Sequence, residues 1–246
     1  MNLSKITDRT FIGKVLRLPL RLIPANAVLP ILQGPLSGLK WITGSGVHGY
    51  WLGVYENGKQ RTFAQWVKAG NVVYDIGANV GYYTLLASTL VGETGQVLAF
   101  EPLPDNLTFL EKHLALNSIH NTRMFEVAVS DENGTAMFSE MSERSSGHLD
   151  STGKMEVRTV KLDTLYKNGE IPPPVVMKID VEGAEYQVLM GALSILEEHH
   201  PVIFLATHGR EVHKQSCDLL LRLGYQLTSI SSASVETSDE LLGVFR

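Results

Sequence analysis

From residue 71 onward, short apolar runs alternate along the chain with longer segments of helical periodicity. The runs are rich in Val, Ile, Leu and Phe, the composition of strands that are buried on both faces. Parallel strands need long crossover connections, usually helices, and these come to cover both faces of the sheet. The alternation therefore predicts an α/β fold with a doubly wound, mainly parallel sheet.

The expected elements follow one another with one main interruption. Strands are predicted at residues 72–77, 97–102, 122–130, 175–180, 201–208, 225–230 and 240–245, and helices at 80–91, 105–117, 184–197 and 211–224. Between the third and fourth strands lies a polar insert, in which the runs at 136–140 and 155–160 predict a hairpin. Its serine-rich part, 139–153, is either a lid over an acceptor or a plain hairpin.

Residues 1–70 differ in amino-acid composition from the rest of the chain. They form a second expected region, an N-terminal extension to a ligand-binding domain at 71–246. Frequent glycine and aromatic residues predict a β-hairpin in this extension. Its strands are expected near 39–43 and 49–55 with a turn at Asn57-Gly58, followed by a helix over 61–70 that ends at Gly70. Four aromatic side chains of this region either wall an acceptor pocket or cover a sheet edge: Trp41, His48, Tyr50 and Trp51.

The first residues form a basic amphipathic segment. Residues 3–24 carry five basic side chains and one acidic side chain, interleaved with apolar residues. A signal peptide is not expected, because Arg17, Pro19 and Arg21 interrupt the apolar stretch that a leader needs. The segment is expected to form a helix that either docks on the domain or lies peripherally on an anionic membrane surface.

Charge and cysteine content exclude several classes of function. The formal net charge is -5 and the pI is about 5.9, so no overall positive field favours a nucleic-acid partner. The single cysteine, Cys217, excludes an internal disulfide and a cysteine-rich metal site. No uncharged apolar run is long enough to span a membrane. We therefore expect a cytoplasmic protein, with peripheral membrane contact through residues 3–24 as the open alternative.

A polar loop follows the first predicted strand, and ligands in open α/β sheets bind at the carboxyl ends of strands. The loop runs from Asp75 to Gly81, and its glycines let the backbone approach a ligand closely. Asn79 tolerates the left-handed conformation that a glycine would otherwise supply. The dinucleotide fingerprint fails, because Tyr82 stands where its third glycine is needed. A carboxylate at Asp75 would repel a pyrophosphate but suits an amino group, such as that of S-adenosylmethionine.

A second carboxylate follows the second predicted strand. Glu101 can accept hydrogen bonds from both hydroxyls of a ribose, as carboxylates at this point of nucleoside-binding α/β domains do. Pro102 fixes the turn after it, and Asn106 opens the next helix. With the Asp75 loop, these residues predict a nucleoside-binding site, to which Tyr82 is added as a neighbour.

The fourth predicted strand ends in several carboxylates, in the stretch MKIDVEGAE. Asp180 and Glu182 are expected to face an acceptor and are candidate catalytic residues, since a buried carboxylate can also serve as a base. Glu185 falls in the first turn of a helix, where negative charge suits the helix N-terminus. His208 ends the fifth strand and is the candidate general base, because its ordinary pKa of about 6.5 suits proton removal. Asp180, Glu182 and His208 could also supply ligands for magnesium, but their spacing decides nothing, so no metal ligand is assigned.

Four motifs resemble the FkbM family of class I S-adenosylmethionine-dependent methyltransferases. They are VVYDIGANVGYYTLLAS (72–88), AFEPLPDN (99–106), VAVSD (127–131) and MKIDVEGAEYQVLMGA (177–192), and the resemblance extends over about residues 71 to 207. It implies a Rossmann-like, seven-stranded sheet that ends in an antiparallel hairpin, bound S-adenosylmethionine, and methyl transfer to a hydroxyl of a sugar, glycan or small metabolite.

The resemblance also implies roles for particular residues. The methionine moiety would be held by Asp75, Gly77, Ala78, Asn79 and Gly81, the ribose by Glu101, and the adenine would border Ala128. The chain departs from the family in strand five, where Ala206-Thr207-His208 lacks the expected acidic residue and puts the role of His208 in doubt.

Two other functions remain open at this point. One is a catalytically silent cofactor-binding module that docks on a membrane surface, and the other, less favoured, is a nicotinamide oxidoreductase. The acceptor, the dependence on a divalent metal and the oligomeric state are not indicated by the sequence.

Overall fold

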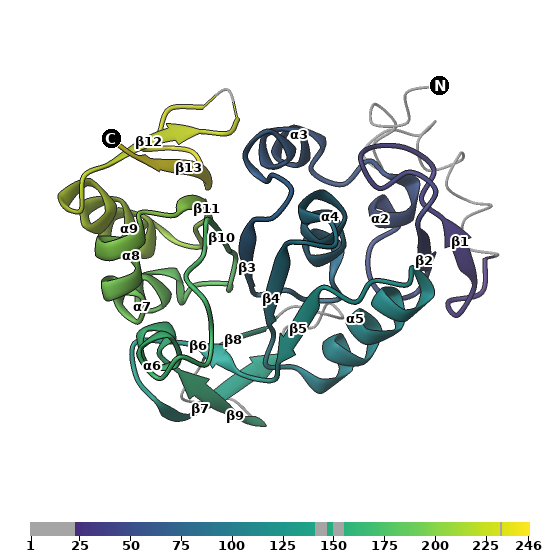
Figure 1. Cartoon of the computed structure of the whole chain (residues 1–246), viewed down its shortest axis with the longest axis horizontal. Coiled ribbons are helices and arrows are strands. Elements are labelled where there is room, and N and C mark those ends of the chain that lie inside the picture. The colour runs from purple at the N-terminus through teal and green to yellow at the C-terminus, as the bar shows by residue number, and fades with distance from the viewer. Residues whose placement is uncertain (1–22, 141–146, 150–154, 232) are drawn as a thin grey trace.

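The computed structural model describes residues 23–140, 147–149, 155–231 and 233–246. Figure 1 shows the path of the chain. Most of the basic segment 3–24 and most of the serine-rich segment 139–153 lie outside these residues. A membrane-docking role for the first and a lid role for the second therefore stay predictions.

The described residues form a seven-stranded sheet in the order β12-β13-β11-β10-β3-β4-β5. Its strands are β3 (Val72–Ile76), β4 (Gln96–Phe100), β5 (Thr122–Phe125), β10 (Val176–Ile179), β11 (Val202–Ala206), β12 (Tyr225–Ser229) and β13 (Glu240–Phe245). Neighbouring strands are parallel except for β13, which is antiparallel to both β11 and β12. The predicted mainly parallel sheet with a terminal antiparallel hairpin is confirmed.

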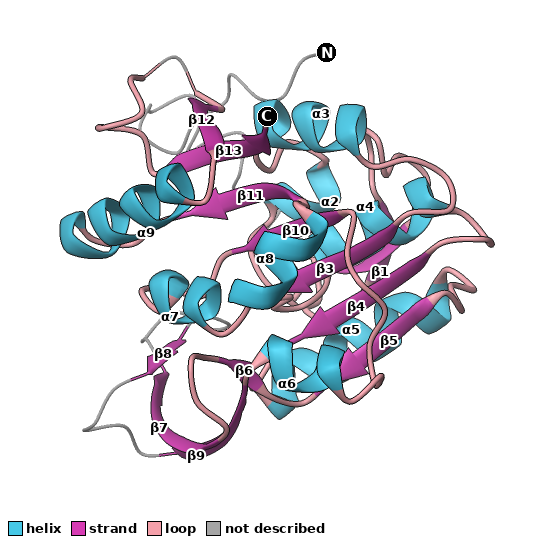
Figure 2. Cartoon of the chain, turned by 60° about the vertical axis from the view of Figure 1, so that its left-hand side comes forward, coloured by secondary structure: helices cyan, strands magenta, loops and turns pink. Residues whose placement is uncertain are grey.

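Helices cover both faces of this sheet, and Figure 2 shows the strands fanned between the two layers. One layer consists of α6 (Leu162–Lys167), α7 (Glu185–Met190), α8 (Leu193–His199) and α9 (Arg210–Arg222). The other consists of α2 (Gly49–Leu52), α3 (Asn57–Trp66), α4 (Tyr82–Val91) and α5 (Pro104–Leu116). Each layer has its own hydrophobic cluster against the sheet, so both sheet faces are buried, as the apolar strands predict.

A smaller four-stranded sheet, in the order β6-β9-β7-β8, is built mainly from the polar insert. Its strands are β6 (Ala128–Val129), β7 (Gly134–Glu140), β8 (Gly147–Leu149) and β9 (Met155–Val160). The predicted hairpin is confirmed by the antiparallel pairing of β7 with β9. The single strand predicted over 122–130 is wrong: β5 pairs with β4 in the large sheet, whereas β6 pairs with β9 in the small one.

Two helical features also differ from the prediction. The helix expected over 184–197 is divided at Gly191 into α7 and α8. A Cβ atom at this position would lie 2.0 Å from the backbone oxygen of Ser130, so the close packing of the chain there requires glycine. Helix α6 was not anticipated, because its six residues are too few to show a helical period.

In the extension, β1 (Val28–Pro30) and β2 (Lys40–Ile42) pair antiparallel, but the strand predicted near 49–55 is wrong. Residues 49–52 form helix α2 and residues 57–66 form α3, so Asn57-Gly58 begins a helix instead of making a hairpin turn. Aromatic residues favour strands only where they fit a pleated surface. Here the ring of Tyr50 packs 5.2 Å from that of Trp41, and this tertiary contact overrides the local preference.

The extension shares a hydrophobic cluster with the rest of the chain. Trp41 and Phe63 belong to the same cluster as Leu85 of α4 and Phe204 of β11. A division into domains at residue 70 stays a prediction, although the two sides bury each other's apolar surface.

His113 of α5 joins the extension to the loop after β3. Its Nδ1 lies 2.8 Å from the carbonyl oxygen of Val80, and its Nε2 lies 3.2 Å from the backbone nitrogen of Ile42. The ring is stacked on Trp41, with 3.7 Å between the ring centroids. The imidazole therefore holds three parts of the fold together.

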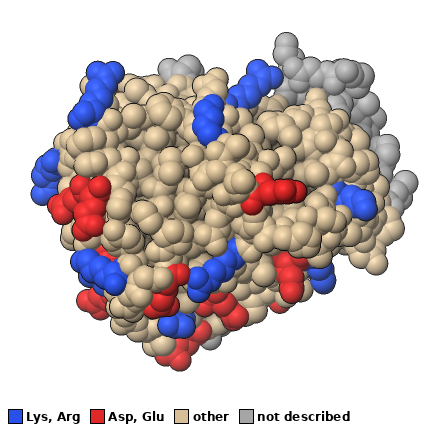
Figure 3. All heavy atoms as spheres, in the orientation of Figure 1, with Lys and Arg blue, Asp and Glu red and all other residues tan. Residues whose placement is uncertain are grey.

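Charged side chains of both signs are mixed on the described surface. On the face in Figure 3, Lys and Arg side chains alternate with Asp and Glu side chains along the lower edge, and the centre carries little charge. Among the described residues, no helix combines the length and apolar character that crossing a membrane requires.

Candidate active site

A cavity of about 340 Å³ opens at the carboxyl ends of β3, β4 and β10. The strand order reverses between β3 and β10, which is where open α/β sheets bind their ligands. Three segments supply most of its wall: 76–80, 100–103 and 178–184. Tyr50 and Tyr55 of the extension close it from another side. The volume is in the usual range for a small-molecule site, about 300–1,000 Å³.

The glycine loop after β3 is shaped by contacts within the protein. Gly77 has φ +75°, and a Cβ atom there would lie 1.9 Å from the backbone oxygen of Asp180. A Cβ atom at Gly81 would lie 2.3 Å from the side chain of Leu110. These packing contacts, in addition to any ligand, require glycine at both positions. Asn79 has φ 52°, so the predicted left-handed conformation is confirmed.

Glu101 links this loop to the end of β4. Its Oε2 accepts a hydrogen bond from the Asn79 backbone N–H at 2.8 Å, and its Oε1 accepts bonds from the Leu103 N–H at 3.1 Å and the Asn106 amide at 3.0 Å. Burial raises the pKa of this carboxyl, and the three hydrogen bonds oppose the rise. A carboxylate has about four acceptor positions, so Glu101 can still accept from a hydroxyl in the cavity.

Asp75 is buried in an ion pair and is not part of the cavity wall. Its Oδ1 lies 3.2 Å from Nζ of Lys178, and its Oδ2 accepts a hydrogen bond from Thr84 at 2.6 Å. Lys178 also donates to the carbonyl oxygen of Gly77 at 2.8 Å and does line the cavity. Burial opposes the charge of Lys178, but Asp75 and Asp180 outweigh it, so its pKa is raised. Asp75, which was expected to contact a ligand, instead forms an ion pair with Lys178, which lines the cavity.

A second buried lysine ties the extension to the same edge of the sheet. Lys59 of α3 lies 2.7 Å from Glu240, 3.5 Å from Glu56 and 3.7 Å from Asp180. Burial raises the pKa of Glu240 to about 7, against the pull of Lys59. Burial would likewise raise the pKa of Asp180, but Lys178 and Lys59 together lower it. Asp180 is therefore an anion at neutral pH.

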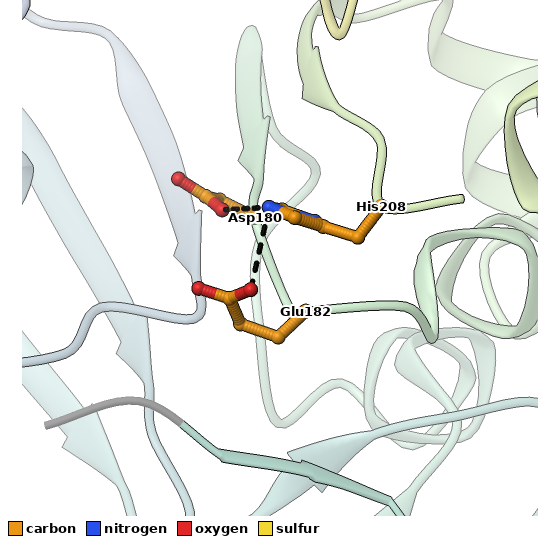
Figure 4. Close-up of side chains that lie close together, drawn as sticks. All are labelled: Asp180, Glu182 and His208. Atoms are coloured by element: carbon orange, nitrogen blue, oxygen red, sulfur yellow. Dashed lines mark ion pairs between the residues drawn. The ribbon is translucent and has the colours of Figure 1, made fainter. Parts of the chain in front are cut away.

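His208 lies beside both carboxylates that follow β10, as Figure 4 shows. Its Nε2 is 3.4 Å from Glu182 Oε2 and 4.0 Å from Asp180 Oδ1. On the other side of the ring, Nδ1 is hydrogen-bonded to Oε1 of Glu185 at 2.8 Å. Glu185 is fully buried and also accepts a hydrogen bond from the Gly183 N–H at 2.9 Å. The helix N-terminus alone was expected to explain Glu185, but the structure shows that it also contacts His208.

The hydrogen bond from Glu185 and the nearby carboxylates raise the pKa of His208 to about 9, although burial opposes the shift. An imidazole with this pKa holds its proton at neutral pH, which makes it a weak proton acceptor. The predicted base role of His208 is untested, and the electrostatics of this arrangement do not favour it.

The predicted residues divide into those that line the cavity and those that support it. The lining includes Gly77, Ala78, Asn79, Tyr82, Glu101, Pro102, Ala128, Asp180 and Glu182. Asp75, Gly81, Asn106 and His208 are outside the lining and contact residues within it. Of the four aromatic residues considered for an acceptor wall, only Tyr50 lines the cavity; Trp41 is fully buried, and the Trp51 indole donates to His48 at 3.2 Å.

Two lysines of the site were missed in the sequence. Lys178 stands inside an otherwise apolar strand and, in the parallel register, opposite Asp75 of β3. A charged residue in each of two buried strands is the pattern that indicates such a pair. Lys59 shows no comparable signal, because it reaches the site only through the packing of α3.

Comparison with known proteins gives a consistent result. Residues 75–227 match a family model described as the methyltransferase FkbM domain. A curated relative, the hexuronic acid methyltransferase AglP of Haloferax volcanii, is 32% identical over 146 residues, which cover 54% of each chain. The chain therefore spans about half the length of this relative.

Solved structures show the same fold. A methyltransferase FkbM from Methylobacillus flagellatus has a TM-score of 0.54 at 17% identity, and the match covers 71% of this chain and 43% of that one. A precorrin-6y C5,15-methyltransferase from Geobacter metallireducens has a TM-score of 0.52 at 14% identity, over 78% of this chain and 90% of that one. At these identities the likeness extends to the fold alone.

Proposed function

Because this chain belongs to the methyltransferase FkbM domain family, we propose that it transfers a methyl group from S-adenosylmethionine to a hydroxyl of a sugar or glycan. The observation that carries the proposal is the hydrogen bond between the Asn79 N–H and Glu101, which joins two ligand-binding loops at the point where the strand order reverses. The nicotinamide and silent-module alternatives gain no support from the family match.

The cavity residues fit the donor that the family implies. S-adenosylmethionine supplies an electrophilic methyl group on a sulfonium centre. Glu101, held by three hydrogen bonds, accepts from the ribose hydroxyls, and Ala128 borders the adenine. The loop at Ala78 and Asn79 presents backbone toward the methionine end. Glu182 adds a carboxylate to the cavity wall, which favours a cationic donor.

The acceptor is proposed to enter beside Asp180 and Glu182. Side chains of these two residues and of His208 are 22%, 36% and 38% exposed, so polar atoms of an acceptor can reach them. Tyr50 and Tyr55 offer aromatic rings at the cavity wall, which suit the apolar face of a sugar ring. The relative named for hexuronic acid supports a sugar acceptor over other metabolites. Alignment of acceptor oxygen and methyl carbon is the main catalytic contribution expected of the site.

Calorimetry with S-adenosylhomocysteine tests the donor assignment. We expect saturable binding to the wild-type chain and loss of most of it in Glu101→Ala, because the ribose loses its carboxylate partner. Glu111→Ala is the matched control, since Glu111 is exposed on the helix that follows Glu101. Absence of binding to the wild-type chain, or equal binding by Glu101→Ala, would contradict the assignment.

The acceptor class is tested with methyl-labelled S-adenosylmethionine and a panel of uronic acids, neutral hexoses and simple alcohols. We expect label on a sugar of the panel or on a glycan that contains it. Mild alkali then distinguishes the products, because it releases the methyl group from a methyl ester of a uronic acid and leaves a methyl ether intact. Labelled ester alone would contradict transfer to a hydroxyl.

A further inference from the structure

We propose that Asp180, Glu182 and His208 bind one divalent cation of the Mg²⁺ or Mn²⁺ type on the acceptor side of the cavity. The task assigned to this ion, holding the acceptor, rests on the methyltransferase function proposed above. Its binding does not, and can be measured separately.

The spacing of the three side chains suits an ion better than direct hydrogen bonds. Each residue offers one ligand atom, and all three atoms lie within 4.8 Å of one another. The 3.4 Å and 4.0 Å from Nε2 of His208 to the two carboxylates exceed a charge-assisted hydrogen bond, which is about 2.7–2.9 Å long. Ligands about 2.1 Å from an octahedral ion lie about 3.0 Å apart when adjacent and about 4.2 Å apart when opposite. The observed separations need only small adjustments to reach these values.

The buried carboxylate of Glu185 orients His208 as a metal-binding histidine is usually oriented. When Nδ1–H donates to Glu185, an ion that displaces the proton from Nε2 would meet the electron pair of this nitrogen on the side of Asp180 and Glu182. Outer carboxylates commonly fix the ring and tautomer of a metal ligand in this way. Glu185 is fully buried, and among the described residues His208 is the one group with which it forms an ion pair. Glu185 is not one of the three proposed ligands, so it orients the imidazole without binding the ion itself.

The charged groups around the site carry more negative than positive charge, which favours a cation. In the connected network, six carboxylates (Glu56, Asp75, Asp180, Glu182, Glu185 and Glu240) meet two lysines, Lys59 and Lys178, and the imidazole of His208. Both lysines approach Oδ2 of Asp180, at 3.7 Å and 3.9 Å, which leaves Oδ1 toward His208. Within the described part of the chain, Glu182 pairs with His208 alone. The carboxylates outnumber the cationic groups even with a proton on His208, and a divalent ion that replaces this proton would offset the excess of negative charge.

The ligand set indicates the kind of ion and what it could do. Two carboxylate oxygens and one imidazole nitrogen suit Mg²⁺ or Mn²⁺, which fill their remaining positions with water or substrate oxygens. Those positions face the cavity, since Asp180 and Glu182 belong to its wall. Neighbouring hydroxyls of a sugar could replace the waters there. An ion that coordinates the acceptor hydroxyl lowers its pKa and reduces the need for a strong base.

Titration of the chelator-treated full chain with Mn²⁺ tests the site, followed by calorimetry and by loss of the free-ion electron paramagnetic resonance signal. We expect one ion per chain, bound about tenfold or more weakly by Glu182→Gln and by His208→Gln. Glu197→Gln is the control, because it removes the same charge from an exposed position on α8 and should bind Mn²⁺ as the wild type does. S-adenosylhomocysteine binding, measured in chelator, shows that each variant is folded.

The outcomes separate the two proposals. Wild-type chain that binds S-adenosylhomocysteine but shows no saturable uptake of millimolar Mn²⁺ would overturn the ion site and leave the methyltransferase function standing. Equal Mn²⁺ affinity in the wild type and Glu182→Gln would also overturn it, since the ion would then bind elsewhere. Mn²⁺ binding that depends on Glu182 in a chain without affinity for S-adenosylhomocysteine would support the site and refute the proposed donor.

Discussion

His113 is expected to make the stability of this fold depend on pH between neutral and mildly acidic conditions. The ring is fully buried, and each of its nitrogens has a backbone partner. Only the neutral tautomer satisfies both contacts, because Nδ1–H donates to Val80 and Nε2 accepts from the Ile42 N–H. A proton on Nε2 would face that N–H. Burial accordingly lowers the pKa of His113 from 6.5 to about 4, although the bond to Val80 opposes the shift.

The sign and size of the effect follow from this pKa. Between pH 6.5 and 4 the unfolded chain binds a proton at His113 that the folded chain does not, so the stabilisation is complete above 6.5 and lost as pH falls. The loss amounts to about 2 kcal/mol at pH 5 and about 3.4 kcal/mol well below pH 4. A typical domain is stable by only about 5–15 kcal/mol, so this single ring should matter.

Urea unfolding at pH 7 and pH 5 measures the effect. Because other groups titrate in the same range, the informative quantity is the difference in unfolding free energy between wild type and His113→Gln at each pH. We expect this difference to shrink by about 2 kcal/mol from pH 7 to pH 5. His120→Gln shows what removal of an exposed histidine does under the same conditions. A wild-type advantage over His113→Gln that is the same at both pH values would refute the reasoning.

Further expectations concern the loop and the buried ion pair. Gly77→Ala should destabilise the fold by more than the about 1–2 kcal/mol of a left-handed alanine and weaken S-adenosylhomocysteine binding, because its Cβ would meet Asp180. Gly70→Ala is the control in thermal unfolding: it has a similar φ, and its Cβ would make only an ordinary contact with Thr94 at 3.7 Å, so it measures the backbone cost. Lys178→Met should cost about 3–5 kcal/mol in urea unfolding, since it leaves Asp75 buried and unpaired. Adding Asp75→Asn should recover much of that loss, and a double variant no more stable than Lys178→Met would argue against the pair.

Much of the sheet was predictable because each strand and its helix carry local patterns. The runs at β3 and β10 are apolar except for one charged residue each, Asp75 and Lys178, and they are buried on both faces. The turn residues that follow these strands stand next to them in sequence. Asn79 illustrates the point, because its left-handed backbone follows from its own chemistry. Strand order and the placing of Glu101 beside the glycine loop follow from connection rules that hold for all such folds.

The extension shows where local patterns fail. Its aromatic residues favour strands in isolation, but Tyr50 lies in a helix because Trp41, nine residues earlier in the chain, gives its ring a partner. Gly191, between α7 and α8, likewise packs against the backbone at Ser130, which is distant in sequence. Local propensities do not say which residues will meet in the folded chain.

By itself, the sequence determined the doubly wound sheet, the two loops of the donor site and the carboxylates at the end of β10, since these depend on periodicity and on residues close together in the chain. Only the tertiary structure decided which charged side chains pair with one another. In the folded chain Asp75 pairs with Lys178, and Lys59 of α3 lies close to Asp180. His208 lies between Glu185 and Glu182. The physical reason is that Coulombic and hydrogen-bonding partners are chosen by distance in space, and a buried charge takes whichever opposite group the packing brings within reach.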